Sequence, residues 1–141
     1  MVTKKIRKNV EKNFTHDLEF GEMWEDELKD ILENKKLEIK TERGIWVNSG
    51  NLAIEISCAG KPSGLRTTQA EHWMHLLEYE GGLFATIMVE TAILKKVIQK
   101  MVDSKKAKII MGGDDNESEL VLVPMGELFK RNNNYAREVL A

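Results

Sequence analysis

The sequence predicts an α/β domain of the α+β type, in which a mixed central sheet is flanked by helices. Two stretches, 17–34 and 91–104, carry apolar residues at three- and four-residue spacing, which is typical of amphipathic helices. Several shorter stretches alternate apolar and polar residues, which is typical of strands. Both kinds of element follow one another within 141 residues, so we expect one core and no second domain.

Four helices are expected. Residues 17–34 carry acidic side chains in their first half, where they favour the helix dipole. Residues 91–104 combine an apolar stripe with lysines on the remaining surface. Residues 68–71, Thr-Gln-Ala-Glu, fit a capping box and predict a third helix directly after them. A short helix is predicted over 128–140.

The strand predictions rest on alternation and on turn residues. Residues 37–42 and 51–57 alternate apolar and polar side chains, and we expect them to pair as a hairpin-like unit. The apolar insert between them, 45–47, is interpreted as a short third strand. Residues 83–89 are apolar on both faces, which favours a central place in the sheet. Gly-rich turn residues predict a further hairpin, formed by 108–111 and 120–123.

Composition limits the functional classes. The net charge of −2, from 21 basic and 23 acidic residues, disfavours strong nonspecific binding of nucleic acid through overall charge. Cys58 is the single cysteine, so neither a disulfide within the chain nor a CxxC site is expected, and a reducing compartment is favoured. No apolar run approaches the roughly 20 residues that span a bilayer, and we expect no secretory signal. These features predict a cytoplasmic protein, in the host cytoplasm if it is viral.

The N-terminal segment differs from the rest of the chain. Residues 1–15 hold five of the 21 basic residues and lack a clear apolar period, so we predict a flexible basic arm or a short, poorly anchored helix. A single domain is expected over 16–141. A local basic surface of this kind could contact phosphates. The candidate nucleic-acid contacts are Lys4, Lys5, Arg7, Lys8 and Arg66.

Two of the predicted strands carry charged residues on one face. Because alternate side chains of a strand point the same way, Glu38, Lys40 and Glu42 share a face of the first strand. Glu55 and Ser57 share the polar face of the second strand. If the apolar faces of both strands are buried on the same side, Lys40, Glu42 and Glu55 converge. The same alternation is also typical of a half-exposed sheet with cross-strand ion pairs, and that interpretation stays open.

Converging carboxylates indicate a divalent cation, because they repel each other unless a cation or proton neutralises them. Oxygen ligands without paired cysteines favour Mg²⁺ or Mn²⁺ over zinc. Such an ion lowers the pKa of bound water and stabilises charge on a phosphoryl oxygen, and a nearby lysine neutralises the transition state. This is the chemistry of phosphodiester hydrolysis. His72 and His75, three residues apart, lack a third ligand that would make them a zinc site.

The order of these features resembles the PD-(D/E)xK nuclease superfamily, and more narrowly its small phage-type members. The resemblance covers residues 17–90, and its most specific part is the stretch 50–73. This stretch contains Gly-Asn-Leu-Ala-Ile-Glu at 50–55, Gly-Lys-Pro-Ser-Gly at 60–64 and a Thr-rich helix start. It implies a restriction-endonuclease-like core. It also implies that Glu25 is the acid of the first helix, while Glu42 and Glu55 are the two motif carboxylates and bind the metal.

The sequence departs from the family pattern at the position of its lysine, which is Ser57 here. The amine is therefore supplied by Lys40 from the neighbouring strand or by Lys61 from the loop, or activity is lost. A second alignment would take Glu38-Ile39-Lys40 as the motif tripeptide. Gln69 resembles a glutamine that some members carry on the following helix.

The resemblance implies a Mg²⁺- or Mn²⁺-dependent DNA endonuclease or exonuclease. With little room for a recognition domain, structure-specific action like that of junction resolvases is favoured over site-specific restriction, and a homodimer fits this size. The alternative is a catalytically inactive nuclease-fold protein that binds nucleic acid or a protein partner. Ser57 and the lack of net positive charge favour this alternative.

Overall fold

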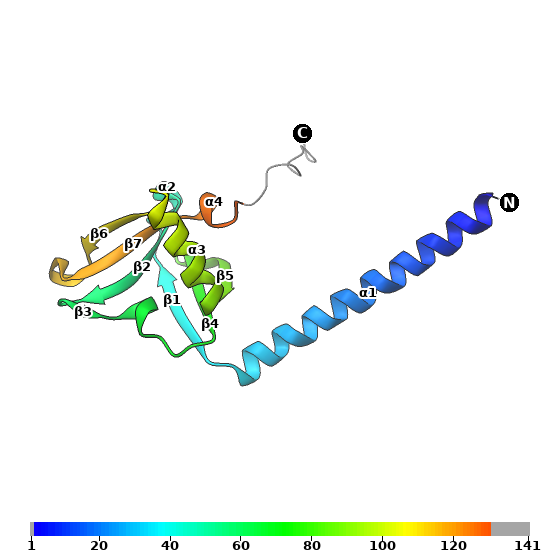
Figure 1. Ribbon diagram of the computed structural model, residues 1–141, viewed down its shortest axis with the longest axis horizontal. Helices are drawn as coiled ribbons and strands as arrows, with labels where there is room; N and C mark the ends of the chain where they lie inside the picture. Colours follow the sequence, from blue (N-terminus) through cyan, green and yellow to red (C-terminus); the bar gives the residue numbers. More distant parts are fainter. Residues whose placement is uncertain (1, 131–141) are drawn as a thin grey trace. The chain divides into compact units, whose positions relative to one another are not determined.

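The computed structural model describes residues 2–130, with the side chains of residues 16–130 (Figure 1). The chain divides into two compact units, Met1–Lys36 and Leu37–Ala141. The first unit contains helix α1 (Val2–Asn34), and the described strands all belong to the second. The predicted α+β class is confirmed.

Helix α1 confirms the helix expected over 17–34 and extends it toward the N-terminus. The backbone is helical from Val2 onward, so the helix also covers the segment that we expected to be a flexible arm. Within the described side chains, Phe20 and Trp24 pack edge to face with ring centroids 6.0 Å apart. The boundary between the compact units falls after Lys36 rather than near residue 15.

The second unit contains two sheets instead of the single mixed central sheet that we expected. In the first, β4 (His72–Tyr79) lies in the centre, parallel to β1 (Leu37–Glu42) and antiparallel to β5 (Gly82–Glu90). The second sheet has the order β3-β2-β7-β6 and is antiparallel. Its strands are β2 (Asn51–Cys58), β3 (Lys61–Pro62), β6 (Lys108–Gly112) and β7 (Ser118–Pro124).

The remaining elements are helices. α3 (Thr91–Asp103) is long and amphipathic, as predicted, and lies in front of the strands in Figure 1. The others are short: α2 (Trp46–Ser49), α4 (Met125–Leu128), and the 3₁₀ turns η1 (Gly64–Arg66) and η2 (Asp114–Asn116). None of the described helices is both long and apolar enough to cross a membrane.

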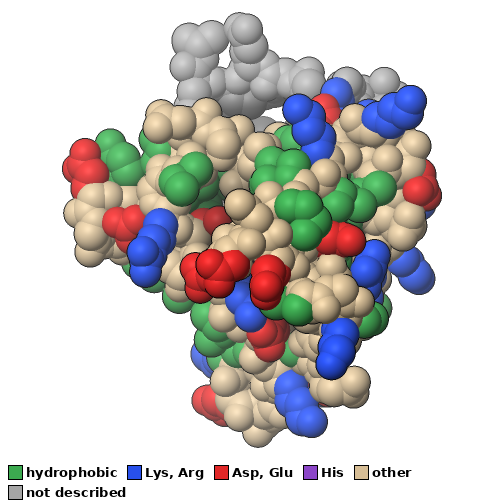
Figure 2. Space-filling view, turned by 90° about the vertical axis from the view of Figure 1, so that its left-hand side faces the viewer, with side chains coloured by type: hydrophobic (Ala, Val, Ile, Leu, Met, Phe, Trp, Pro, Cys, Tyr) green, Lys and Arg blue, Asp and Glu red, His purple; other side chains and the backbone are tan. Residues whose placement is uncertain are grey.

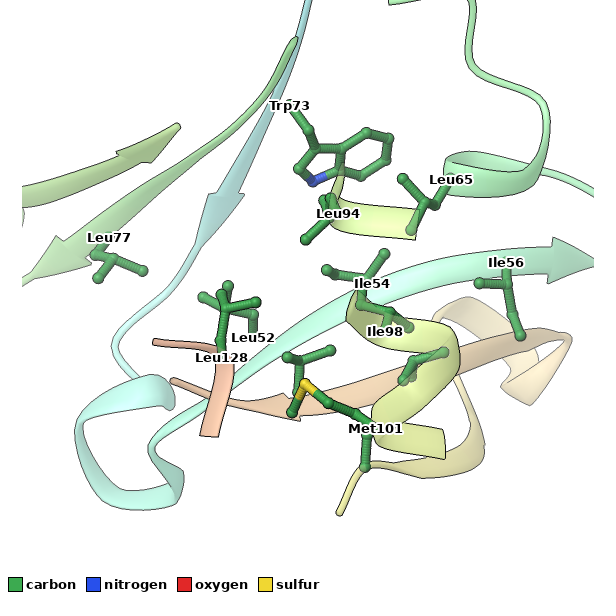
Figure 3. Close-up of a cluster of buried hydrophobic side chains, with 13 residues drawn as sticks. Leu52, Ile54, Ile56, Leu65, Trp73, Leu77, Leu94, Ile98, Met101 and Leu128 are labelled. Carbon is green, nitrogen blue, oxygen red and sulfur yellow. The ribbon is translucent and has the colours of Figure 1, made fainter. Parts of the chain in front are cut away.

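One hydrophobic core joins both sheets to α3 (Figure 3). From β2 it takes Ile54 and its neighbours at two-residue spacing, and from β4 it takes Trp73 and Leu77. Helix α3 contributes Leu94 and Ile98 at four-residue spacing. Burying alternate residues of β2 leaves Ala53 and Glu55 on its opposite face.

The predicted pairing of 37–42 with 51–57 is wrong, although both strands exist. β1 pairs with β4 and β2 pairs with β7, so the two strands belong to different sheets. The insert at 45–47 contributes to helix α2 rather than to a third strand, and Gly50 ends that helix with a left-handed φ of +68°. Alternation identifies a strand and its two faces, but it does not identify the partner strand.

The helix predicted after the capping-box sequence is also wrong, because these residues form β4. Trp73, His75 and Leu77 are buried alternately, which is the period of a strand. The Thr68 hydroxyl accepts a hydrogen bond from the Ala70 N–H at 3.1 Å and thereby closes a turn instead of capping a helix.

Two further predictions need correction or fall partly outside the structure. The strand expected over 83–89 exists as β5, but it lies at the edge of its sheet, and Leu83 and Phe84 are exposed. Its apolar outer side chains therefore did not indicate a central position. The hairpin of β6 and β7 is confirmed. The terminal helix expected over 128–140 lies mostly outside the described residues.

Candidate active site

Three of the predicted site residues line one pocket of the second unit. Its volume is about 270 Å³, and it lies where β1 approaches the face of β2 opposite the apolar core. Lys40 and Glu42 enter it from β1, and Glu55 enters it from β2. The lining is completed by Thr41, Ala53, Trp73 and Leu120. Lys40, Glu42 and Glu55 thus line one pocket as predicted, although the strands that carry them do not pair. The expected burial of the apolar face of β1 was wrong, because Ile39 is 53% exposed.

Glu42 is the last residue of β1 and reaches across to the second sheet. Its Oε1 accepts a hydrogen bond of 2.7 Å from the backbone N–H of Ala53. β3 pairs with β2 at Ser57 and Cys58, so Ala53 lies beyond the end of that short strand and Glu42 satisfies its N–H. The Glu42 side chain is 16% exposed, which makes it a partly buried carboxylate held at the wall of the pocket.

Glu55 is held by two serines from different parts of the chain. Ser63 donates from Oγ to Oε1 at 2.7 Å, and Ser118 on β7 donates from Oγ to Oε2 at 3.3 Å. Each carboxylate oxygen has two lone pairs, so these bonds orient Glu55 and still leave acceptor capacity for a cation.

The Gly-Lys-Pro-Ser-Gly segment at 60–64 brings Ser63 to Glu55. Gly64 has φ +55°, and a Cβ placed on it would lie 2.1 Å from the carbonyl oxygen of Glu55. Only glycine permits this close approach without a shift of the backbone. The backbone N–H of Ser63 also donates to the carbonyl of Ile56 at 3.1 Å. The motif therefore folds the loop over Glu55.

Lys40 lies at the mouth of the pocket. Its Nζ is 2.6 Å from Oε1 of Glu38 and 5.8 Å from the ring centroid of Trp73. The Lys40 side chain is partly exposed, so the amine can reach a bound anion by exchanging its contact with Glu38. Glu38 itself is not part of the pocket lining.

A buried histidine lies behind Glu42, and the sequence did not identify it as part of this site. His75 is 2% exposed, and its Nε2 accepts a hydrogen bond of 2.7 Å from Nε1 of Trp73. Its Nδ1 lies 3.4 Å from Oε1 of Glu42. Because β4 is a strand, His72 and His75 point to opposite faces and do not form a metal-binding pair. Trp73, His75 and Leu77 are buried at every second position, but the apolar Met74 and Leu76 between them hide this period in the sequence.

Several accessory candidates do not line this pocket. Ser57 follows a β-bulge after Glu55, and its side chain is buried with only 5% exposed. The bulge breaks the alternation that we expected to carry Ser57 to the face of Glu55. Lys61 lies on β3, and Gln69 lies in the loop before β4 rather than on a helix; neither lines the pocket.

The remaining candidates lie elsewhere. Arg66 lines a different pocket of about 390 Å³, together with Lys95 and residues of the core. Glu25 is exposed on α1 and belongs to the first unit. The side chains of Lys4, Lys5, Arg7 and Lys8 lie outside the described part of the chain. Figure 2 shows Lys and Arg side chains interspersed with Asp and Glu on one face, without a continuous basic surface.

The donor set of the pocket fits a hard cation that keeps much of its water. Among the described residues no group of three or more His, Cys, Asp or Glu side chains could hold a metal ion. Mg²⁺ is commonly bound through one or two carboxylates, with water and substrate phosphate as the other ligands. Glu42 and Glu55 supply that number of carboxylates. Comparison with protein families, curated proteins and solved structures found no match to this chain.

Proposed function

We propose that the protein is a metal-dependent nuclease that hydrolyses phosphodiester bonds in DNA. The observation that carries this proposal is the pocket that joins Lys40, Glu42 and Glu55. Two carboxylates and an amine in a small pocket match the charge pattern of metal-assisted phosphoryl transfer. The restriction-endonuclease-like core and the superfamily resemblance belong to this proposal.

Each pocket residue has a role that follows from its contacts. Glu42 and Glu55 would hold Mg²⁺ or Mn²⁺, which when bound activates a water molecule and offsets charge on the phosphoryl oxygens. Ala53 keeps Glu42 in place through its N–H, and Ser63 keeps Glu55 in place through its hydroxyl. Lys40 binds a substrate phosphate at the pocket mouth and stabilises the negative charge that develops there.

The cleavage assay uses branched, single-stranded and duplex DNA with Mg²⁺ or Mn²⁺. We expect metal-dependent cleavage by the wild-type protein and its loss in Glu55→Gln and Glu42→Gln. Glu90→Gln is the matched control, because Glu90 is an exposed carboxylate at the end of β5 in the same sheet and does not line the pocket. Cleavage that survives Glu55→Gln, or that is lost equally in Glu90→Gln, would show that the site lies elsewhere.

A homodimer is proposed as the acting form, since two copies place two such pockets on one branched substrate. Light scattering is then expected to give twice the chain mass of 16.1 kDa. A single-copy mass in the presence and absence of DNA would contradict this.

A second function is favoured by one observation. Ser57 occupies the position of the family's lysine, and its side chain is buried away from the pocket. An inactive nuclease-fold protein that binds nucleic acid or a protein partner would retain the fold without a lysine at this motif position. DNA binding without cleavage of any of the three substrates would support this alternative over the nuclease.

A further inference from the structure

His75 occupies the centre of the first sheet and is almost completely buried. Its strand, β4, lies between β1 and β5, and the His75 side chain is 2% exposed. In the parallel register of β1 and β4, His75 lies opposite Lys40, two pairs away from the end of β1 where Glu42 is placed. A buried polar ring beside a pocket carboxylate needs hydrogen-bond partners on both of its nitrogens.

The contact with Trp73 determines which ring nitrogen carries the proton. The indole Nε1 of Trp73 has an N–H and no lone pair to offer, so it can only donate. It lies 2.7 Å from Nε2 of His75, which must therefore be the accepting nitrogen. The imidazole proton is consequently on Nδ1, the nitrogen that faces Glu42.

The Nδ1–H of His75 is a buried hydrogen-bond donor. Among the described residues it has no hydrogen-bond partner, and Oε1 of Glu42 lies 3.4 Å away. That distance is longer than an ordinary N–H···O bond, so a hydrogen bond to Glu42 requires a small movement of one of the two side chains. Because an unpaired buried N–H is unfavourable, such a movement is favoured.

We infer that His75 is a positioning residue for Glu42. Two donors from different sheets face Oε1: the Ala53 N–H donates to it at 2.7 Å, and the His75 Nδ1–H lies 3.4 Å away and pairs with it after that movement. They hold that oxygen toward the protein and leave Oε2 as the oxygen available to a cation. The relay Trp73–His75–Glu42 thus fixes the carboxylate in the way that outer hydrogen bonds fix metal ligands. The inference rests on the proposed function, in which Glu42 is a metal ligand.

Two substitutions separate this role from simple packing. His75→Asn places an amide N–H near the former Nδ1 and so keeps a donor for Glu42, but it removes the acceptor of Trp73. His75→Gln places its amide near the former Nε2, which keeps a partner for Trp73 but removes the donor for Glu42. His72→Gln is the control, since His72 is on the same strand but does not line the pocket of Lys40, Glu42 and Glu55.

The measurements are Mn²⁺ affinity by titration without DNA, thermal unfolding, and the His75 tautomer by nitrogen NMR of the metal-free protein. We expect the Nδ1–H tautomer in the wild type. We also expect Mn²⁺ affinity to fall on the order of 10-fold in His75→Gln, and less in His75→Asn, because loss of an outer-shell partner typically costs 10–100-fold. Thermal stability is expected to follow the opposite order, because His75→Gln keeps the partner of Trp73. His72→Gln is expected to match the wild type in affinity.

The outcomes are distinct. An Nε2–H tautomer of His75 overturns the inference. A Mn²⁺ affinity that falls more in His75→Asn than in His75→Gln, as the thermal stability does, also overturns it. A wild-type protein that binds Mn²⁺ but shows either of these results overturns the positioning role alone. A wild-type protein that binds no Mn²⁺ overturns the proposed function, and the role of His75 toward a metal falls with it.

Discussion

Replacing Gly64 with alanine tests the loop that holds Glu55. Gly64 has φ +55°, a left-handed conformation that costs an L-residue about 1–2 kcal/mol. The new Cβ would also lie 2.1 Å from the carbonyl oxygen and 2.7 Å from the carbonyl carbon of Glu55. These are backbone atoms of a buried strand, so the loop must move, and overpacking of this kind costs roughly 1–3 kcal/mol more.

Gly60→Ala is the matched control. Gly60 has φ +75° in the same loop, but no atom lies within 4 Å of the Cβ that alanine would add. Gly60→Ala should therefore lower the free energy of unfolding only by the cost of the left-handed conformation, about 1–2 kcal/mol. Urea unfolding measures both variants, with equal m-values showing that the free energies can be compared. Equal losses for Gly60→Ala and Gly64→Ala would refute the close packing of the loop on Glu55.

Three further substitutions test the pocket and the core. Ser63→Ala removes a hydrogen bond to Glu55 and should lower the free energy of unfolding by about 1 kcal/mol and the Mn²⁺ affinity by about 10-fold. An unchanged affinity in a metal titration would contradict the effect on Mn²⁺. Lys40→Ala should slow DNA cleavage on the order of 100-fold, whereas Lys61→Ala should not, because Lys61 lies outside the pocket. Equal rates of the two variants in a single-turnover assay would contradict the role of Lys40 in cleavage. Ile54→Ala should lower the free energy of unfolding by about 2–5 kcal/mol and Ile39→Ala by much less, because Ile54 is fully buried and Ile39 is 53% exposed. Similar losses for both variants in urea unfolding would contradict this placement of β1.

Much of the pocket could be predicted from local alternation. The period of two in 37–42 and in 51–57 correctly assigned both segments as strands and placed Glu55 on the polar face of its strand. This works because the side-chain direction of a strand depends on its own backbone alone. The proximity of Glu55 to Lys40 and Glu42, by contrast, was inferred from a hairpin of the two strands that does not form and from burial of Ile39, which is 53% exposed.

The partner of each strand could not be predicted in the same way. β1 pairs with β4, whose residues lie more than 30 positions later in the chain, and a local pattern does not specify so distant a partner. The sequence Thr-Gln-Ala-Glu at 68–71 satisfied the rule for a helix start, yet the Thr68 hydroxyl closes a turn. The incorrect helix assignment hid His75, because on a helix it would not share a face with both Trp73 and Leu77.

Ser57 shows a different reason for failure. The strand pattern placed it on the face of Glu55, but the bulge between Glu55 and Ser57 moves it into a buried position. A bulge depends on how β2 and β7 fit together, so the sequence of β2 alone does not reveal it. The amine of the pocket consequently comes from β1, and Lys40 is the residue that lines it.

We propose that Glu42 and Glu55 together hold one divalent cation. The most direct measurement is the anomalous scattering of Mn²⁺ in crystals of the wild-type protein and of Glu55→Gln. We predict one strong peak in the Lys40–Glu42–Glu55 pocket of the wild type and its loss in the variant. A pocket without a peak at saturating Mn²⁺, or a peak bound by other side chains, would contradict the claim.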